Sequence, residues 1–197
     1  MLPLLTWDLS TSDAGLVSGG ETGQWEYGIA TSGPSLMEPV WGTRLTGLYL
    51  NDAVDHLTLS LPDISALSQP VLSFTHWYDI LPGDLGTLEV ERASGWEPIE
   101  PVYGYPVIQG GFAGTSVGTQ TAFVSLPTDA QALRFVLTAD LSLSSDGWYL
   151  LDASLWDGDA VPPQILAVSS PTDTQDLVGP YTWVIQVDDN LNSAPSV

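Results

Sequence analysis

Carboxylates are the reactive side chains that this sequence holds in number. The 197 residues include 24 Asp and Glu against three Arg, and the net charge is −21. Asp8 falls in an expected first strand, and Asp152 lies between Leu151 and Ala153 in an apolar strand. A carboxylate among large apolar groups must be paired or ligated, and calcium takes six to eight oxygen ligands. A structural Ca²⁺ is therefore one expectation; the other is that Asp152 accepts backbone N–H bonds or points to solvent.

Other reactive constellations are missing from the sequence. It has no cysteine and only two histidines, and it contains no His-Glu-x-x-His, no Gly-x-Ser-x-Gly and no phosphate loop. His76 lies in an apolar segment and is predicted to be a packed, hydrogen-bonded core residue, whereas His56 is expected to be exposed. The acids from Asp55 to Asp63 are expected to lie in solvated turns. These observations predict that the chain is not an enzyme.

Tryptophan is the second abundant functional type, with eight residues. Exposed aromatic rings on a β-sandwich can stack on sugars, but packing in the core or at its rim is the commoner role. Packing is the expected role for most of them, and a carbohydrate-binding module stays open as an alternative. The tryptophans considered are Trp25, Trp41, Trp77, Trp96, Trp148 and Trp156.

The elements that carry these residues are short strands. Gly and Pro are scattered along the chain, and the apolar residues between them alternate with a period of two, which is typical of strands with one buried face. Leu133, Phe135 and Leu137 fall on one face, as do Leu88 and Val90. The predicted fold is an all-β, antiparallel jelly-roll β-sandwich. The predicted strands are residues 56–61, 71–80, 86–92, 132–139, 147–156, 164–168 and 181–187.

A domain boundary is expected near Pro162 and Pro163, with a sandwich over residues 1–160 and a second part over 161–197. Two strands cannot form a stable sandwich alone, so the second part is predicted to be either the start of another module or an arm that pairs with a neighbour. The start at Met1 is too short for a signal peptide, and we expect it to begin a fragment. No apolar run is long enough to span a membrane.

The charge excludes several partners. A surface with a net charge of −21 repels phosphate, so neither nucleic acid nor an anionic membrane surface is an expected partner. Hydrophobic residues still make up 44% of the chain, which is enough to bury a core and fold.

Several sequence blocks, in this order along residues 4–157, resemble MAM-like jelly-roll domains, and most closely the accessory domains of immune-inhibitor-A-type secreted bacterial metallopeptidases. The blocks are Trp25-Glu26-Tyr27-Gly28, Ser32-Gly33-Pro34, Trp41-Gly42-Thr43, Thr46-Gly47-Leu48-Tyr49, Leu72 to Tyr78, Gly86 to Val90, Leu133-Arg134-Phe135 and Gly147 to Asp152. The residues from Pro162 through Asp173, Gly179 and Asp188 look like the opening of an immunoglobulin- or fibronectin-like module.

The resemblance implies a structural cation near the first and last strands. Asp8 and Asp152 stand at the matching places, and Glu26 is a third candidate ligand. Two differences from these families limit which of their properties can be expected of this chain. Eukaryotic MAM domains carry disulfides, which this chain cannot form, and the peptidase unit of the bacterial family is absent. The predicted function is a non-catalytic module of a larger secreted or cell-surface protein, serving binding, adhesion or spacing. Its expected partners are neighbouring domains or subunits, with glycans as a further class; a surface-layer subunit that assembles by strand addition is an alternative.

Overall fold

The computed structural model describes residues 2–34, 37–169 and 184–188, and all of the regular elements in these ranges are β-strands. The chain divides into two compact units, Met1–Gly158 and Asp159–Val197, which are described separately. No helix in the described ranges is long and apolar enough to cross a membrane.

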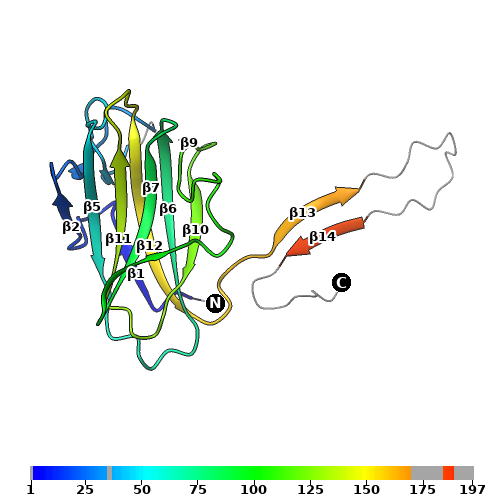
Figure 1. Cartoon of the computed structure of the whole chain (residues 1–197). Helices are drawn as coiled ribbons and strands as arrows, with labels where there is room; N and C mark the ends of the chain where they lie inside the picture. Colours follow the sequence, from blue (N-terminus) through cyan, green and yellow to red (C-terminus); the bar gives the residue numbers. More distant parts are fainter. Residues whose placement is uncertain (1, 35–36, 170–183, 189–197) are drawn as a thin grey trace, which may run out of the picture. The chain divides into compact units, whose positions relative to one another are not determined.

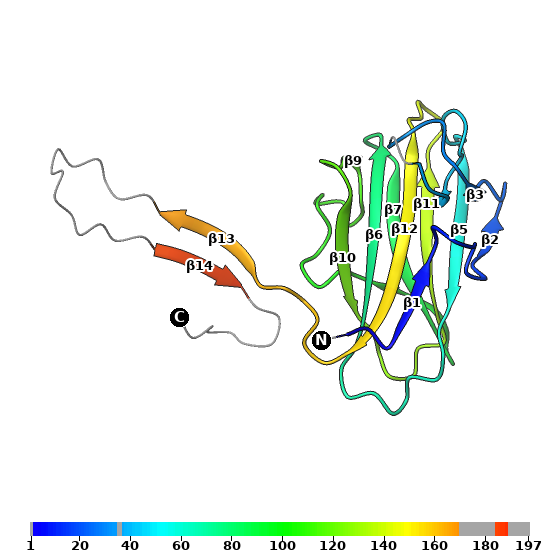
Figure 2. The same ribbon diagram turned by 180° about the vertical axis from the view of Figure 1, so that it is seen from behind.

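The first unit is a sandwich of two antiparallel sheets (Figure 1), as predicted. The larger sheet runs in the order β10, β6, β12, β4 and β3, with β1 also paired to β12 and β9 also paired to β6. Figure 2 shows β10, β6, β12 and β1 side by side. The bounds of its strands are β1 (Leu5–Asp8), β3 (Glu26–Gly28), β4 (Val40–Gly42), β6 (Pro70–Ile80), β9 (Gly114–Thr115), β10 (Gln120–Ser125) and β12 (Gly147–Asp157).

The smaller sheet runs in the order β2, β5, β11, β7 and β8. Its strands match the sequence pattern, because the residues predicted to face inward are buried and their neighbours Glu89 and Glu91 are not. The bounds are β2 (Val17–Gly20), β5 (Ala53–Ser60), β7 (Leu85–Arg92), β8 (Gly95–Ile99) and β11 (Ala132–Ala139).

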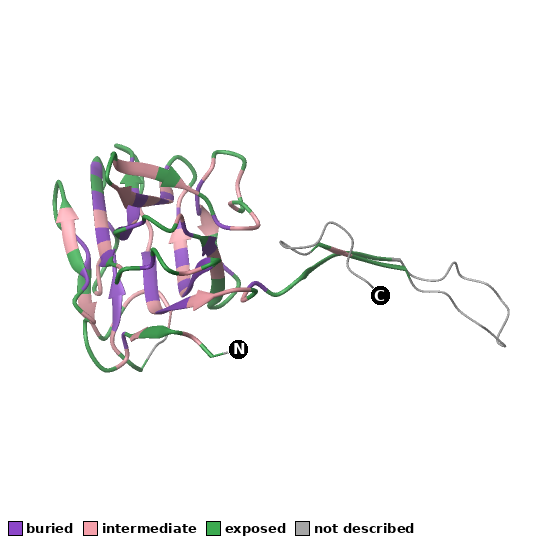
Figure 3. Cartoon of the chain, turned by 90° about the horizontal axis from the view of Figure 1, so that it is seen from below, coloured by how far each residue is buried: buried purple, intermediate pink, exposed green. Residues whose placement is uncertain are grey.

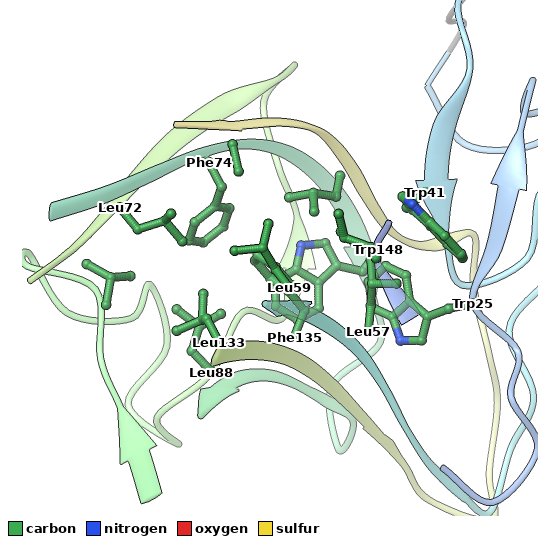
Figure 4. Packing of buried hydrophobic residues seen from close by; sticks show 14 of the residues in the cluster. Trp25, Trp41, Leu57, Leu59, Leu72, Phe74, Leu88, Leu133, Phe135 and Trp148 are labelled. Carbon is green, nitrogen blue, oxygen red and sulfur yellow. The ribbon is translucent and has the colours of Figure 1, made fainter. Parts of the chain in front are cut away.

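The core lies between the two sheets, where the buried residues line the inside of the sandwich (Figure 3). Phe74 of β6 and Phe135 of β11 come from opposite sheets, and their rings meet edge to face with centroids 5.0 Å apart. Trp148 of β12 packs against the same Phe135 and against Trp25 (Figure 4). Burial of these large side chains is the main force that holds the sheets together.

The second unit contains one two-stranded antiparallel ribbon, formed by β13 (Gln164–Ser169) and β14 (Val184–Asp188). The assignment of residues 161–197 to an immunoglobulin- or fibronectin-like module stays a prediction. Several residues that carry it, including Asp173 and Gly179, lie outside the described residues.

Candidate functional site

The outer face of the larger sheet brings together the acids that the sequence predicts to be ligands. The register pairs Thr121 of β10 with Thr75 of β6, Thr75 with Asp152 of β12, and Asp152 with Asp8 of β1. These four side chains form a line across four adjacent strands, which we call the polar row. Asp8 and Thr121 are exposed, and Thr75 and Asp152 are half-buried.

A β-bulge places Asp152 in the polar row. Trp148 and Leu150 point into the core, so a regular strand would also point residue 152 inward. The register of β12 against β6 shifts between Leu150 and Asp152, which leaves Leu151 as the extra residue. The shift turns Asp152 outward, opposite Thr75, and returns Ala153 to the core.

Asp8 and Asp152 are direct cross-strand partners, and two like charges in such positions repel each other. Asp8 accepts hydrogen bonds at Oδ1 from the backbone N–H and the hydroxyl of Ser10, at 3.0 and 2.6 Å. Burial raises the pKa of Asp152, and the charge of Asp8 adds to the rise while a hydrogen bond from Thr75 opposes it. The position therefore favours any group that neutralises the charge of this pair or donates a hydrogen bond to it.

Glu26, the third predicted ligand, lies on the same outer face, but its carboxylate already interacts with a neighbouring loop. Its Oε2 accepts the backbone N–H of Leu45 at 2.8 Å, and its Oε1 lies 3.8 Å from Nε of Arg44. Among the residues that the structure describes, no group of three or more His, Asp or Glu side chains is placed to hold a metal ion. The structure thus brings Asp8 and Asp152 together, whereas the carboxylate of Glu26 contacts the loop that contains Arg44 and Leu45. Calcium binding stays a prediction.

Aromatic side chains flank the polar row on the same face. Trp77 of β6 lies on one side, with its ring edge-on to Tyr149 at 5.6 Å. Tyr149 is itself fixed, because its hydroxyl donates a hydrogen bond to the carbonyl of Arg44 at 2.8 Å. Its ring lies so close to Gly42 that a Cβ there would come within 2.7 Å.

On the other side of the row lie Trp156 of β12 and Phe123 of β10. The indole N–H of Trp156 donates a hydrogen bond to the hydroxyl of Ser73 at 2.8 Å, which holds the ring over the neighbouring strand. Trp77, Phe123 and Trp156 are all partly exposed. The prediction that most tryptophans pack in the core is confirmed for Trp25, Trp41 and Trp148, which are buried.

The two histidines differ in their burial. His76 is buried as predicted, and its Nδ1 accepts the indole N–H of Trp148 at 3.0 Å. Burial lowers the pKa of His76 to about 3, so its ring is neutral at physiological pH. His56 is half-buried rather than exposed, and burial together with the charge of Arg134 lowers its pKa.

One acid predicted to be solvated is buried instead. Asp55 is 0% exposed, and its carboxylate accepts hydrogen bonds from Thr22 N, Thr22 Oγ1, Gly23 N and Gln24 Nε2 at 2.6 to 2.8 Å. Burial alone would raise the pKa of Asp55, but these hydrogen bonds outweigh it and lower that pKa. The turn prediction was wrong because Asp55 belongs to β5, where it anchors the loop that follows β2.

A second buried acid, Asp84, was not singled out from the sequence. Its Oδ2 accepts the hydroxyl of Tyr49 at 2.5 Å, and its Oδ1 accepts the backbone N–H of Asp140 at 2.6 Å. The Tyr49 hydroxyl also accepts the N–H of Leu81 at 3.2 Å. This arrangement joins three loops at one end of the sandwich, and burial followed by the Asp84 hydrogen bond raises the pKa of Tyr49.

All three arginines stand beside acids. Arg44 lies beside Glu26, and Arg92 pairs with Asp129 at 3.0 Å. Arg134 pairs with Glu89 and lies 4.3 Å above the ring of Trp96 on the smaller sheet. The polar row is therefore lined by acidic and neutral groups, and its potential is negative.

Comparison with known proteins finds only distant similarities to this chain. No model of a known protein family matches it. It is similar to Bacillopeptidase F of Bacillus subtilis (strain 168), with 29% identity over an alignment of 186 residues, and the match covers 85% of this chain. The aligned region spans 12% of the length of Bacillopeptidase F. The narrower resemblance to MAM-like domains stays a prediction.

Solved structures give similarly distant likenesses. The K1 cleaved adhesin domain of Lys-gingipain from Porphyromonas gingivalis W83 matches with 15% identity and a TM-score of 0.47, over 78% of this chain and 98% of that domain. A carbohydrate-binding module, CBM28, which is specific for non-crystalline cellulose, matches with 8% identity and a TM-score of 0.33, over 69% of this chain and 86% of that module. The sandwich fold is established by the strand pairing of this chain itself.

Proposed function

We propose that residues 1–158 form a non-catalytic binding module, and that the module binds through the outer face of the larger sheet. The polar row carries this proposal. Its four side chains come from adjacent strands, lie in register, and stand between partly exposed aromatic rings. Hydrogen-bonding groups beside apolar ring faces are the usual composition of a recognition surface.

The burial of His76 supports a binding role over a catalytic one. A general base must reach its substrate and titrate near the working pH. His76 is buried with a pKa lowered to about 3 by that burial, so it meets neither condition. We expect no hydrolysis of any ligand that the module binds.

The module is proposed to belong to a larger secreted or cell-surface protein, with neighbouring domains or subunits as partners. The similarity to 12% of the length of Bacillopeptidase F supports this, because that protein has room for many further domains. A structural Ca²⁺ held by Asp8 and Asp152, with backbone carbonyls and water as further ligands, remains part of the proposal.

A matched pair of variants tests the binding surface. Thr121 lies in the polar row and Thr138 lies on the smaller sheet, and both are exposed strand residues. We expect Thr121→Arg to weaken capture of the labelled chain on glycan and matrix-protein arrays, and Thr138→Arg to leave it unchanged. Equal capture by the two variants would place the binding surface elsewhere, and turnover of a captured ligand would overturn the non-catalytic assignment.

The ribbon in the second unit favours a second candidate function, assembly with a neighbouring chain. The register puts Ile165 with Val187 and Val168 with Ile185, so these apolar side chains share one face of the ribbon. Ile165, Val168 and Ile185 are 66%, 52% and 53% exposed. A two-stranded ribbon is marginal alone and gains stability when such a face is covered. Light scattering tests this candidate: oligomers that Ile185→Lys dissociates support it, and a monomer at all concentrations contradicts it.

A further inference from the structure

We propose that the ligand of the outer face is an extended polysaccharide without acidic groups, lying along β6 and β12 and stacking on Trp77 and Trp156. This inference rests on the proposed function, because it takes the outer face of the larger sheet to be the binding surface. It adds the chemical class of the ligand, its direction on the sheet, and the two side chains that hold it.

The two tryptophans are set at a distance that suits a chain rather than a single sugar. Trp156 lies opposite Val71 in the register, and Val71 precedes Trp77 by six positions in β6. At about 3.3 Å per residue, the Cα positions of the two tryptophans are about 20 Å apart along the strands, and the indole N–H of Trp156 reaches Ser73, which lies between them. That span covers several sugar rings in succession, so a monosaccharide cannot contact both rings.

Both indoles are held before any ligand arrives. Trp156 is tied to Ser73 by its N–H, and Trp77 packs on the ring of Tyr149, which is itself fixed by its hydrogen bond to Arg44. Fixed aromatic rings offer contact area at a low cost in conformational entropy. The apolar C–H face of a pyranose ring can therefore stack on each indole without first ordering it.

The surface between the two indoles suits hydroxyl groups. Thr75 and Thr121 contact each other through their hydroxyls at 3.4 Å, and Thr6 and Ser154 do so at 3.0 Å. Asp152 adds carboxylate oxygens beside Thr75. Hydroxyl groups both donate and accept, and carboxylates accept only, so the row complements a ligand that carries many O–H donors.

Charge decides which polysaccharides fit. The chain carries a net charge of −21, and Asp152 stands in the middle of the proposed track with Asp8 beside it on β1. Uronic acids or sulfated sugars would meet like charge there, whereas neutral or amine-bearing sugars would not. An extended peptide is the less fitting ligand, because peptides are held mainly through the backbone at a sheet edge, and this surface is the side-chain face of central strands.

The test uses the whole chain in a calcium-containing buffer and measures depletion from solution by amorphous cellulose, chitin, chitosan and mannan. Heparin-agarose serves as the acidic polysaccharide and polylysine-agarose as the basic peptide. We expect retention on at least one of the first four and none on heparin. Trp77→Ala and Trp156→Ala should each weaken that retention by roughly tenfold, as truncation of a central tryptophan commonly does. Trp96→Ala on the smaller sheet is the matched control and should bind like the wild type.

The outcomes separate the ligand class from the binding surface. Retention that Trp77→Ala and Trp156→Ala leave unchanged overturns both the inference and the proposed surface. Retention on polylysine alone, lost in both variants, keeps the surface and overturns the polysaccharide. Failure of the wild type to bind any of the four polysaccharides also overturns the inference, and thermal melting of each variant identifies losses that come from unfolding.

Discussion

The indole N–H of Trp148 donates a hydrogen bond to Nδ1 of His76 in the middle of the sandwich core. The two residues are cross-strand neighbours, since His76 pairs with Leu150 and Tyr78 pairs with Trp148. The imidazole lies among the rings of Phe74 and Phe112, at 4.9 and 4.7 Å. A protonated imidazole could not accept this hydrogen bond at Nδ1 and would place a charge in an apolar site.

The stability of the sandwich should therefore fall as the pH is lowered through the range of an ordinary histidine. Burial lowers the pKa of His76 from 6.5 to about 3, so between these values the unfolded chain binds a proton that the folded chain does not. The free energy of unfolding then decreases with falling pH, by up to about 1.4 kcal/mol per pH unit. Urea unfolding followed by tryptophan fluorescence from about pH 7.5 to about pH 5.5 measures this slope. His76→Gln keeps an acceptor for Trp148 but cannot titrate, so it should lose the part of the slope that His76 causes and keep the part that the lowered pKa of His56 causes. Parallel curves for the two proteins would show that His76 does not contribute.

The alternation of apolar residues was enough to predict the sandwich and most of its inward-facing residues. Period-two patterns such as Leu133, Phe135 and Leu137 reflect a physical requirement of a strand with one buried face, and the structure confirms them. The same rule could have identified Asp55, which lies in phase with Leu57 and Leu59 of β5 and is buried with them. Because Asp55 is polar, it was predicted to lie in a turn, although it continues the alternation of Leu57 and Leu59.

The candidate site depends on features that a pattern along one strand cannot contain. Asp8 and Asp152 face each other because β1 pairs with β12, a pairing between segments more than a hundred residues apart. Asp152 points outward only because of the bulge after Leu150. The resemblance to known domains predicted that the two acids belong together, and Glu26 was included without a signal for its bond to the Leu45 backbone.

Removal of the Asp55 carboxylate should destabilise the fold strongly. Asp55→Ala leaves four donors without their acceptor, one of them the buried amide of Gln24, and losses of about 3 kcal/mol are typical when the charged partner of such a network is removed. Urea unfolding at neutral pH is the measurement. Asp63→Ala is the matched control, because Asp63 is exposed and accepts hydrogen bonds only within its own turn. A similar small loss in both variants would mean that water replaces the carboxylate in the Asp55 site.

The bond between Tyr49 and Asp84 should act as a coupled pair. Tyr49→Phe leaves a buried carboxylate oxygen and the Leu81 N–H without their partner, and Asp84→Asn removes the charge that the phenol contacts. Each change should cost about 1–3 kcal/mol, and the double variant should cost clearly less than their sum. Denaturant unfolding of the four proteins of this double-mutant cycle gives the coupling energy. Additive losses would show that the short contact contributes nothing beyond packing.

Calcium should raise the melting temperature of the sandwich if it bridges Asp8 and Asp152. A cation at this pair would relieve the repulsion between facing carboxylates, and a ligand that binds only the folded chain stabilises it by RT ln(1 + [L]/Kd), about 2.7 kcal/mol at a hundredfold excess over Kd. Two carboxylates make a weak site, so the increase should saturate only at high calcium concentration. Thermal melting should be followed in calcium chloride and in sodium chloride of equal ionic strength, because screening alone stabilises a chain with a net charge of −21. Asp8→Asn and Asp152→Asn should abolish the calcium-specific part while Asp63→Asn retains it; an equal shift in all of these variants would assign the effect to the general charge of the surface.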